Sequence, residues 1–348
     1  MSTLHWISEP DYFRERDLPL YREELESFVP DRVLDCHAHI YLTAHQSRTP
    51  TEAEIRASFG SHERDFSVDH LFEALGALMP ATRHEALVFG MPSKYMDIDA
   101  GNAYVADQLS DPRVHGLALL DPRADEGSLN RLLEEGGFLG FKPYHALVDR
   151  PTEEVSIVDM VPRAARRVAG FRRAIIMLHV PRAGRIADPR NIDEVCELCV
   201  ECPNVSVILA HIGRSYGPWF IEQAIDRLRQ FPNLYYDVAA LDDAETIEVV
   251  LNAVPSERLL FGTDLPITAH RGKHLCVNRQ CIFLTRERHP WSISSETGGA
   301  LQLTFFVYET LRALKRASGK CALTRGQVEG IFYGNARALI ERAMAAVS

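Results

Sequence analysis

The sequence lacks any apolar run that approaches the roughly 20 consecutive residues a membrane-spanning helix requires. Its first 30 residues are rich in charged and aromatic side chains, and they show no continuous apolar core of the kind a signal peptide contains. We therefore expect no membrane association, and we expect the cytoplasm as the compartment.

The chain also lacks an excess of basic residues, since 38 lysines and arginines face 48 aspartates and glutamates, a formal net charge of -10. Nucleic-acid-binding proteins usually carry a basic excess or a basic stripe, and this sequence has neither. Nucleic acid is accordingly not expected as a partner. The 348 residues, 46% of them hydrophobic, suit one large or two medium globular domains.

Cysteines do not form an evident disulfide framework, because their number, seven, is odd and no secretion signal is visible. Reduced thiols are therefore predicted. Cys196, Cys199 and Cys202 form a C-x2-C-x2-C run that is similar to part of an iron–sulfur cluster loop. No glycine-rich loop surrounds the run and no fourth cysteine follows closely. The spacing instead predicts a helix over 191–202 that buries its cysteines.

Apolar runs typical of buried strands recur along the chain, and helical patterns separate them. The strand candidates are 32–40, 85–91, 114–121, 137–144, 174–180, 205–211, 234–240 and 258–264. The helix candidates are 67–78, 100–110, 126–136, 153–168 with a break at Pro162, 191–202, 217–231 and 242–254. This alternation predicts an α/β fold, a (β/α)8 TIM barrel over 31–348 that follows a polar N-terminal extension over 1–30. An open doubly wound sheet is the alternative.

Two long polar segments fall outside the alternation, 41–66 after the first strand and 265–303 after the eighth. Both are expected to be loops on the side of the barrel that carries active sites, and long loops of this kind usually serve function. We expect 265–303 to act as a lid or to read the substrate. The C-terminal segment 323–347 reads as a helix that breaks at Gly334 and then resumes.

Residue types that bind metals follow directly on several of the strand candidates. His37 and His39 end the first strand and, by alternation, should point to one side together with Asp35. The remaining candidates are Lys142, His179, His211 and Asp264. Any one of these residues alone is more often structural, but the ends of barrel strands converge on one small space. Imidazoles and a carboxylate gathered there suit Zn²⁺ or a similar ion.

The sequence strongly resembles the amidohydrolase superfamily, and within it the amidohydrolase 2 branch, which contains aminocarboxymuconate semialdehyde decarboxylase and several lactonases. The matching stretches are "DCHAHI", "GFKPY", "MLHV", "LAHIGR", "FGTDLP" and "GNARAL", in the family's order, from residue 32 to about 340. The resemblance implies a TIM barrel whose divalent ion, Zn²⁺ first and Mn²⁺ second, is held by His37, His39, His179 and Asp264. It also implies that His211 orients or deprotonates a water molecule or contacts the substrate.

Two of these positions allow more than one role. Lys142 matches a lysine that some amidohydrolases carboxylate to bridge two metals, with His179 and His211 as further ligands. In a one-metal site, which we favour, Lys142 would remain a cation facing an anionic substrate. Asp35 could fix the tautomer of a ligand histidine, or it could cap the end of the strand.

Further polar residues suggest that the substrate carries a carboxylate. Arg182, Arg214 and Arg271 lie just past the candidate ligands, where cations would favour an acid, although each could equally be a solvated loop charge. Tyr144 and His145 follow Lys142 and could line the same pocket.

By analogy with the superfamily, where hydrolysis is the commoner chemistry, the resemblance favours a metal-dependent hydrolase in which metal-activated water attacks the carbonyl of a lactone, an amide or a similar acidic small molecule. Asp264 and His211 would be its catalytic residues. The alternative is a non-oxidative decarboxylase, a lyase, acting on a small aromatic or unsaturated acid, because fold and ligands do not fix the reaction. A barrel that binds a metabolite without turnover is the third reading. Assembly into a homo-oligomer stays open.

Overall fold

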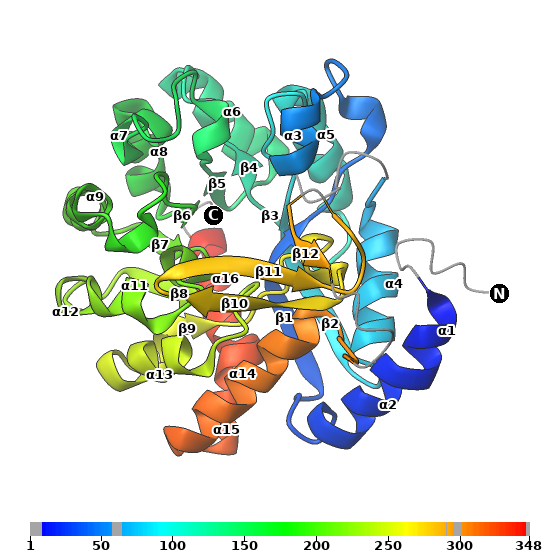
Figure 1. Ribbon diagram of the computed structural model, residues 1–348. Helices are drawn as coiled ribbons and strands as arrows, with labels where there is room; N and C mark the ends of the chain where they lie inside the picture. Colours follow the sequence, from blue (N-terminus) through cyan, green and yellow to red (C-terminus); the bar gives the residue numbers. More distant parts are fainter. Residues whose placement is uncertain (1–8, 58–64, 290, 295–300, 346–348) are drawn as a thin grey trace.

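The strands of the computed structural model follow one another around a central ring (Figure 1). The structure describes residues 9–57, 65–289, 291–294 and 301–345. The strands of the ring are β1 (Arg32–His39), β2 (Arg83–Phe89), β3 (Val114–Gly116), β4 (Ala118–Leu119), β5 (Gly140–Lys142), β6 (Ile175–Leu178), β7 (Ser206–Leu209), β8 (Leu234–Asp237) and β9 (Leu259–Leu260). All neighbouring pairs are parallel, and β3 and β4 occupy one position that is interrupted at Leu117.

Backbone hydrogen bonds close the ring between its last and first strands. The Cys36 amide donates to the Phe261 carbonyl at 3.0 Å, and the His39 amide donates to the Leu265 carbonyl at 2.9 Å. The Leu117 amide donates to the Val88 carbonyl at 2.9 Å, which joins β2 to the β3–β4 position. The predicted α/β barrel is therefore confirmed, and the strands end together at one mouth, where such folds carry their active sites.

The helices lie on the outside of the ring and begin where the sequence offers capping residues. They are α4 (Val68–Leu78), α5 (Ile98–Gln108), α6 (Glu126–Gly136), α7 (Ile157–Met160), α8 (Arg163–Arg172), α9 (Pro189–Glu201), α10 (His211–Arg214), α11 (Pro218–Glu222), α12 (Ile225–Leu228) and α13 (Ala244–Ala253). Ser67, Asp97 and Asp125 each accept a backbone N–H in the first turn of their helix. The predicted break at Pro162 is confirmed, because it caps α8, whereas the single helix predicted over 217–231 is divided into α11 and α12.

The predicted helix with the cysteine run is α9, and the iron–sulfur alternative finds no support there. Cys199 and Cys202 are buried against the apolar core and Cys196 is half-buried, each as a free thiol. The buried face of this amphipathic helix therefore accounts for the spacing.

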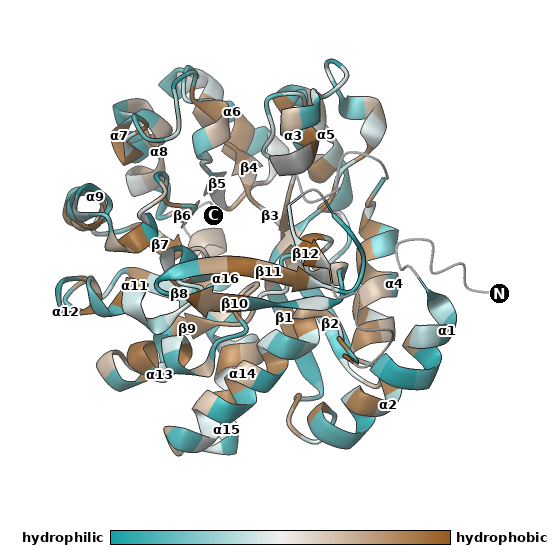
Figure 2. Ribbon diagram, in the orientation of Figure 1, coloured by the Kyte–Doolittle hydropathy of each residue, from teal (hydrophilic) through white to brown (hydrophobic). Residues whose placement is uncertain are grey.

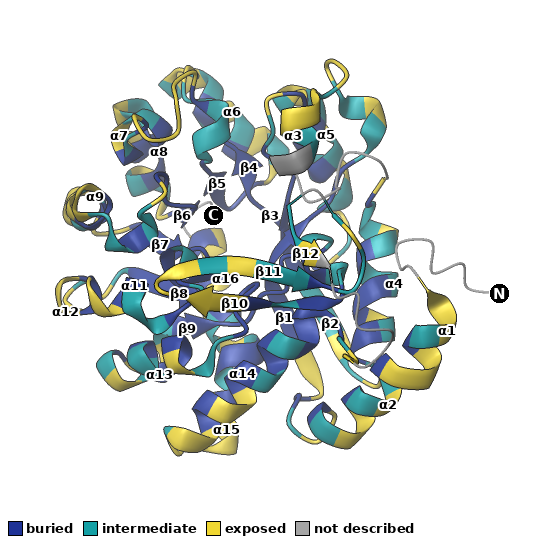
Figure 3. Ribbon diagram, viewed as in Figure 1, coloured by how far each residue is buried: buried dark blue, intermediate teal, exposed yellow. Residues whose placement is uncertain are grey.

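The end of the barrel opposite the mouth is closed by the C-terminal helix. Helices α14 (Phe306–Lys320) and α15 (Arg325–Glu329) are followed by a π-helical turn over Gly330–Gly334 and by α16 (Asn335–Ala345). At Gly334 the chain thus passes through a π-helical turn and stays helical, where a break was predicted. Leu339 and Ile340 of α16 pack on residues inside the barrel such as Leu34, Ile175 and Ile208. Figure 3 shows the strands of the ring in the colour of buried residues, and β6, β7 and β9 are also mostly apolar in Figure 2.

The N-terminal segment is helical over 10–25, in α1 (Pro10–Tyr12), α2 (Leu18–Leu20) and the π-helical turns Phe13–Asp17 and Tyr21–Leu25. Tyr21 stacks on Tyr308 of α14, with ring centroids 5.6 Å apart. Asp17 is buried and accepts hydrogen bonds from Arg271 at 2.8 Å and from Thr304 at 2.8 Å. Among the described residues, no helix is long and apolar enough to cross a membrane.

The segment after the eighth strand corrects two predictions. Instead of an irregular loop it holds a β-hairpin, β10 (Gly272–Val277) and β11 (Gln280–Thr285), with β12 (Ile293–Ser294) beside β11. This lid hairpin, residues 272–285, lies across the ring of strands in Figure 1. Cys276 and Cys281 face each other in the hairpin and form a disulfide, so the prediction of reduced thiols is wrong for this pair.

The loop predicted over 41–66 is also partly helical. It contains a 3-10 turn over Thr43–His45 and the helix α3 (Glu52–Ala57). Residues 58–64 of this prediction lie outside the described part of the chain.

Candidate metal centre at the barrel mouth

An irregularity in β1 decides which side chains of "DCHAHI" reach the mouth. The pairing of β1 with β2 shifts register between Asp35 and Ala38. Cys36 packs in the barrel interior, and Ala38 packs in the outer core. His37 and His39 both line the pocket at the mouth. A register shift changes which face each residue takes, so strict alternation of the side chains does not hold.

Alternation had predicted that Asp35 lies beside the histidine rings. Because of the register shift, it does not. Its carboxylate accepts hydrogen bonds from the backbone amides of His37 at 3.0 Å and Thr263 at 2.8 Å, and from the Thr263 hydroxyl at 2.5 Å. Asp35 thus braces the backbones of β1 and of the segment after β9. Burial raises its pKa to about 7.

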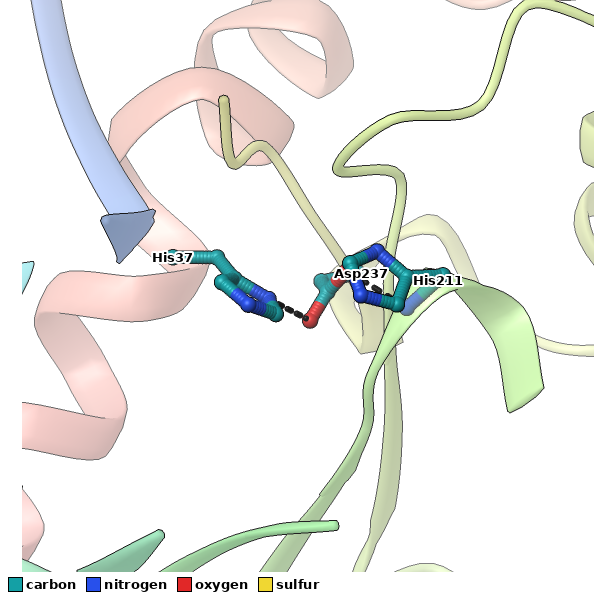
Figure 4. A group of neighbouring side chains, drawn as sticks. All are labelled: His37, His211 and Asp237. Carbon is teal, nitrogen blue, oxygen red and sulfur yellow. Dashed lines mark hydrogen bonds and ion pairs between the residues drawn. The ribbon is translucent and has the colours of Figure 1, made fainter. Parts of the chain in front are cut away.

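The residue that does fix a histidine tautomer is Asp237, which the sequence analysis missed. It ends β8 and is fully buried. One carboxylate oxygen lies 3.0 Å from His37 Nδ1, and the other accepts the His211 backbone amide at 2.8 Å (Figure 4). Burial raises the pKa of Asp237, and the neighbouring His211 and Lys142 oppose this shift. The available sequence signal was an aspartate inside the apolar run 234–240.

The other histidines are oriented by backbone carbonyls. His39 Nδ1 lies 3.0 Å from the Gly90 carbonyl, and His211 Nδ1 lies 2.8 Å from the Ala239 carbonyl. A carbonyl can only accept, so each Nδ1 carries a proton, and a neutral ring of this tautomer would present its lone pair at Nε2. With Asp237 serving His37 in the same way, the structure prepares three Nε2 atoms as electron-pair donors.

These Nε2 atoms converge on Asp264. Its carboxylate lies 3.4 Å from His37 Nε2, 3.2 Å from His39 Nε2 and 4.0 Å from His211 Nε2. Burial acts to raise the pKa of Asp264, but the surrounding imidazoles outweigh burial and hold that pKa below its ordinary value. The carboxylate is therefore ionised at neutral pH.

The backbone around this carboxylate is itself unusual. His211, Ile212 and Asp264 all adopt positive φ angles, of 55°, 48° and 61°. Such conformations are costly for residues other than glycine, and they collect at functional sites where the surrounding structure enforces them. Here they turn His211 and Asp264 into the mouth immediately after their strands.

The spacing of the donors fits a tetrahedral ion. With metal–ligand bonds of about 2.0–2.1 Å and tetrahedral angles, neighbouring donor atoms lie about 3.3 Å apart. The distances from Asp264 to His37 and His39, 3.4 and 3.2 Å, match this value. His179 lies outside this tight group, with its ring centroid 5.6 Å from that of His211, but it lines the same pocket. Its buried Nδ1 has no hydrogen-bond partner in the described part of the chain.

Lys142 lies at the inner edge of these donors. It is fully buried, with Nζ 3.2 Å from His37 Nε2 and 4.3 Å from the centre of the Phe89 ring. Burial lowers its pKa to about 8. Burial and the Lys142 charge together lower the pKa of His37 well below its ordinary value, so the His37 ring is neutral and its Nε2 lone pair faces the Lys142 amine.

The pocket above the donors has a volume of about 270 Å³. The predicted residues Lys142, Tyr144 and His145 all line it. Residues that the sequence analysis did not single out complete the wall: Glu54, Lys94, Tyr216, His274, Phe283, Trp291 and Phe306. Two of these residues, His274 and Phe283, lie on β10 and β11, which come from a part of the chain that has no barrel strand.

His274 is the most informative of the added residues. Its ring stacks on Tyr216, with centroids 4.4 Å apart, and its Nδ1 lies 3.3 Å from the Asp242 carboxylate. Its Nε2 is buried without a hydrogen-bond partner in the described part of the chain. A buried nitrogen left unpaired costs about 1–3 kcal/mol, which a polar group of a ligand would recover.

The arginines predicted to bind substrate are not part of the pocket wall. Arg182 is buried and donates to Glu194 at 2.6 Å and to Asn191 at 2.6 Å. Arg271 pairs with the buried Asp17. Arg214 donates to the backbone carbonyl of Arg182 at 2.9 Å, although its charge contributes to lowering the pKa values of His145 and His179. The structure thus uses these cations to hold loops together.

Comparison with known proteins agrees with this geometry. The amidohydrolase family model matches residues 34–342, which is most of the chain. The chain belongs to the amidohydrolase family. It is therefore an enzyme of that metal-dependent superfamily, and the structure holds groups of histidine and aspartate side chains that could bind an ion. No curated protein matches the sequence.

Solved structures with the same fold span several chemistries. An amidohydrolase from Burkholderia multivorans with bound zinc is 15% identical and has a TM-score of 0.57, over 89% of this chain and 99% of that one. A 4-oxalomesaconate hydratase from Rhodopseudomonas palustris is 16% identical, with a TM-score of 0.54 over 90% and 97%. A 2,6-dihydroxybenzoate decarboxylase from Rhizobium is 14% identical, with a TM-score of 0.53 over 90% and 98%. At these identities the likeness concerns the fold alone.

Proposed function

We propose that this amidohydrolase is a metal-dependent hydrolase that adds water to the carbonyl of a small, carboxylate-bearing substrate. The observation that carries the proposal is the convergence of His37, His39 and His211 on Asp264, with every Nδ1 hydrogen-bonded and every Nε2 directed toward the Asp264 carboxylate. A divalent ion held by His37, His39, Asp264 and the nearby His179, most simply Zn²⁺, would lower the pKa of a water molecule from 15.7 to about 7.

His211 is the residue placed to take the proton. Its Nδ1–H is held by the Ala239 carbonyl, so Nε2, which lies 4.0 Å from the Asp264 carboxylate, is the nitrogen that could accept a proton. Asp264 Oδ2, on the same side, can hold the water in line. The Asp237 carboxylate and the Gly90 carbonyl keep the His37 and His39 rings from turning.

The pocket wall supports a small acidic substrate. A volume of about 270 Å³ suits a compact molecule. The ammonium group of Lys94 at the rim offers a donor for a carboxylate, and Nε2 of His274 offers a second one when that nitrogen carries a proton. These two residues replace Arg182 and Arg271 in the proposal, because neither arginine lines the pocket.

We propose one ion at the mouth. Lys142 keeps its amine 3.2 Å from His37 Nε2 and its charge faces the carboxylates of Asp237 and Asp264. A zinc-loaded crystal structure with extra density on the Lys142 amine and a second ion beside it would replace this proposal with the binuclear alternative.

The test is a screen of lactones and amides of small dicarboxylic acids with the zinc-loaded enzyme in ¹⁸O-labelled water. We expect one ¹⁸O atom in the product acid, and no product with the Asp264→Asn variant. The matched control is Asp121→Asn, since Asp121 also follows a barrel strand but pairs with Arg123 outside the pocket. It should retain full turnover.

Aromatic side chains in the wall favour decarboxylation of an aromatic acid as the second candidate. Tyr144, Tyr216 and Phe283 offer flat faces that suit a ring. Hydroxybenzoic acids therefore belong in the same screen. Release of CO2 without ¹⁸O incorporation would reject the hydrolase and establish this lyase.

A further inference from the structure

A second group of metal-binding side chains lies at the open end of the lid hairpin. The antiparallel ladder pairs Gly272 with Thr285, and the Arg286 amide donates to the Arg271 carbonyl at 2.9 Å. The ladder therefore continues beyond the strands, and its register sets His270 opposite Glu287. His289 follows two residues later, after a bend of the chain at residues 286–287.

The donor atoms of His270, Glu287 and His289 all lie within 4.8 Å of one another. The His270 and His289 rings have centroids 4.6 Å apart and are nearly perpendicular, at 73°. His289 Nε2 lies 4.0 Å from the Glu287 carboxylate. Two imidazoles and one carboxylate form a ligand set that proteins use for zinc, with a fourth position left to water.

The two arginines next to this group have carboxylate partners from the N-terminal segment. Arg271 pairs with the buried Asp17 at 2.8 Å, and Arg286 pairs with Glu9 at 2.7 Å. Both guanidinium groups thus already face carboxylates from the N-terminal segment. The Glu287 side chain is 39% exposed, so an ion can reach it from solvent.

We propose that His270, Glu287 and His289 bind a second divalent cation of the zinc class, separate from the donors at the barrel mouth. The ion would link the two strands of the hairpin at its open end, where the chain enters β10 and leaves β11. The Cys276–Cys281 disulfide links the same two strands near the turn. The lid hairpin would then be cross-linked at both ends.

The site would also act on the pocket wall. The Trp291 ring stacks on His289, with centroids 4.6 Å apart and planes within 8°. Trp291 lines the pocket, as does Phe283, with ring centroids 5.4 Å from those of Trp291. Fixing His289 therefore fixes the aromatic rim over the substrate space.

The test counts ions in chelator-stripped protein that is dialysed against buffered Zn²⁺ and analysed by mass spectrometry of the metal. We expect His270→Ala/His289→Ala to bind one ion fewer per chain than the wild type. Asp264→Asn should also lose one ion and should retain the lid site. Substitution by Co²⁺ gives an independent readout, because the double variant should lose one set of the d–d absorption bands.

Arg288→Ala is the matched control, since Arg288 is exposed and lies between Glu287 and His289 in the chain. It should bind as many ions as the wild type. Glu287→Gln keeps the shape of the side chain and should weaken the binding of the second ion. The test therefore does not depend on whether the double variant folds well. Equal ion counts in the wild type, the double variant and Glu287→Gln would overturn the proposal and leave an ion pair stacked on a tryptophan.

Discussion

The two ends of the barrel are built from the same strands, yet they are filled with opposite kinds of side chain. At the end closed by α16, Leu339 and Ile340 belong to an apolar cluster that includes Leu34 and Ile208. At the mouth, buried histidines, aspartates and a lysine stand within a few ångströms of one another. The comparison teaches that apolar burial at the closed end stabilises the fold, whereas burial of polar groups at the mouth lowers that stability.

The cost at the mouth follows from burial. A buried polar atom is destabilising unless it has a partner, and most of the polar atoms here have one. The Nδ1 atoms of His37, His39 and His211 are held, whereas their Nε2 atoms point at a shared carboxylate. The atoms left available are thus the ones that an ion would use.

Asp264→Asn should give the largest effect at the mouth. We expect loss of the bound ion and a fall in turnover of about 10²–10⁴-fold, since the variant removes both a ligand charge and the carboxylate oxygen that would hold the water. The free energy of unfolding of the metal-free protein should change little. Metal analysis and urea unfolding of the same preparation check both statements. An Asp264→Asn protein that keeps its ion and its turnover would contradict this role.

Ile340→Ala should show the reverse pattern at the closed end. Ile340 is fully buried in the core below the donors. Its truncation leaves a cavity and should lower the free energy of unfolding by about 2–5 kcal/mol. Zinc content should stay at the wild-type value under conditions where the variant is folded. A normal unfolding curve with lost zinc would show that the two ends are not separable.

Acid should destabilise both ends in the same direction. His84 lies at the start of β2 and His145 follows β5, and burial lowers both pKa values to about 4. Between about pH 6.5 and pH 4 the unfolded chain binds protons that the folded chain refuses, so stability falls as the pH falls through this window. Each histidine contributes up to about 3 kcal/mol.

Urea unfolding across this pH range measures the loss. His84→Asn and His145→Asn should each flatten the dependence by a similar amount, although the two residues lie at opposite ends. If the free energy of unfolding kept the same dependence on pH in both variants, other titrating groups would be responsible for it.

Asp237→Asn should have the smallest effect of the set. It keeps a hydrogen-bond partner for His37 but removes the charge behind the ring, and changes of this kind typically weaken metal binding about 10–100-fold. Competition with a chromophoric chelator measures the affinity. Asp35→Asn, which touches only backbone amides and Thr263, is the control and should leave the affinity nearer to the wild-type value.

The fold could be predicted because local sequence patterns, the apolar runs and the capping residues, determine its strands and helices. The eight apolar runs became the eight positions of the ring, and capping residues such as Ser67 and Asp125 marked where helices begin. Pro162 marked a break for the same local reason, since it lacks the amide that a helix interior needs.

The parts that escaped prediction depend on contacts between distant residues. The bulge in β1 arises from its pairing with β2, and it moved Asp35 away from the rings. Asp237 gained its role from His37, 200 residues earlier in the chain. His274 reaches the pocket only because the lid hairpin folds back, and Arg271 is occupied by Asp17 of the N-terminal helix. The roles predicted for the ligand residues themselves stay predictions.

Anomalous diffraction at the zinc edge, from crystals of protein purified without chelator, tests the central claim most directly. The account predicts an anomalous peak at the mouth, about 2.0–2.2 Å from Nε2 of His37 and His39 and from a carboxylate oxygen of Asp264. A map without such a peak at any transition-metal edge, in crystals where these side chains keep the arrangement described above, would contradict it.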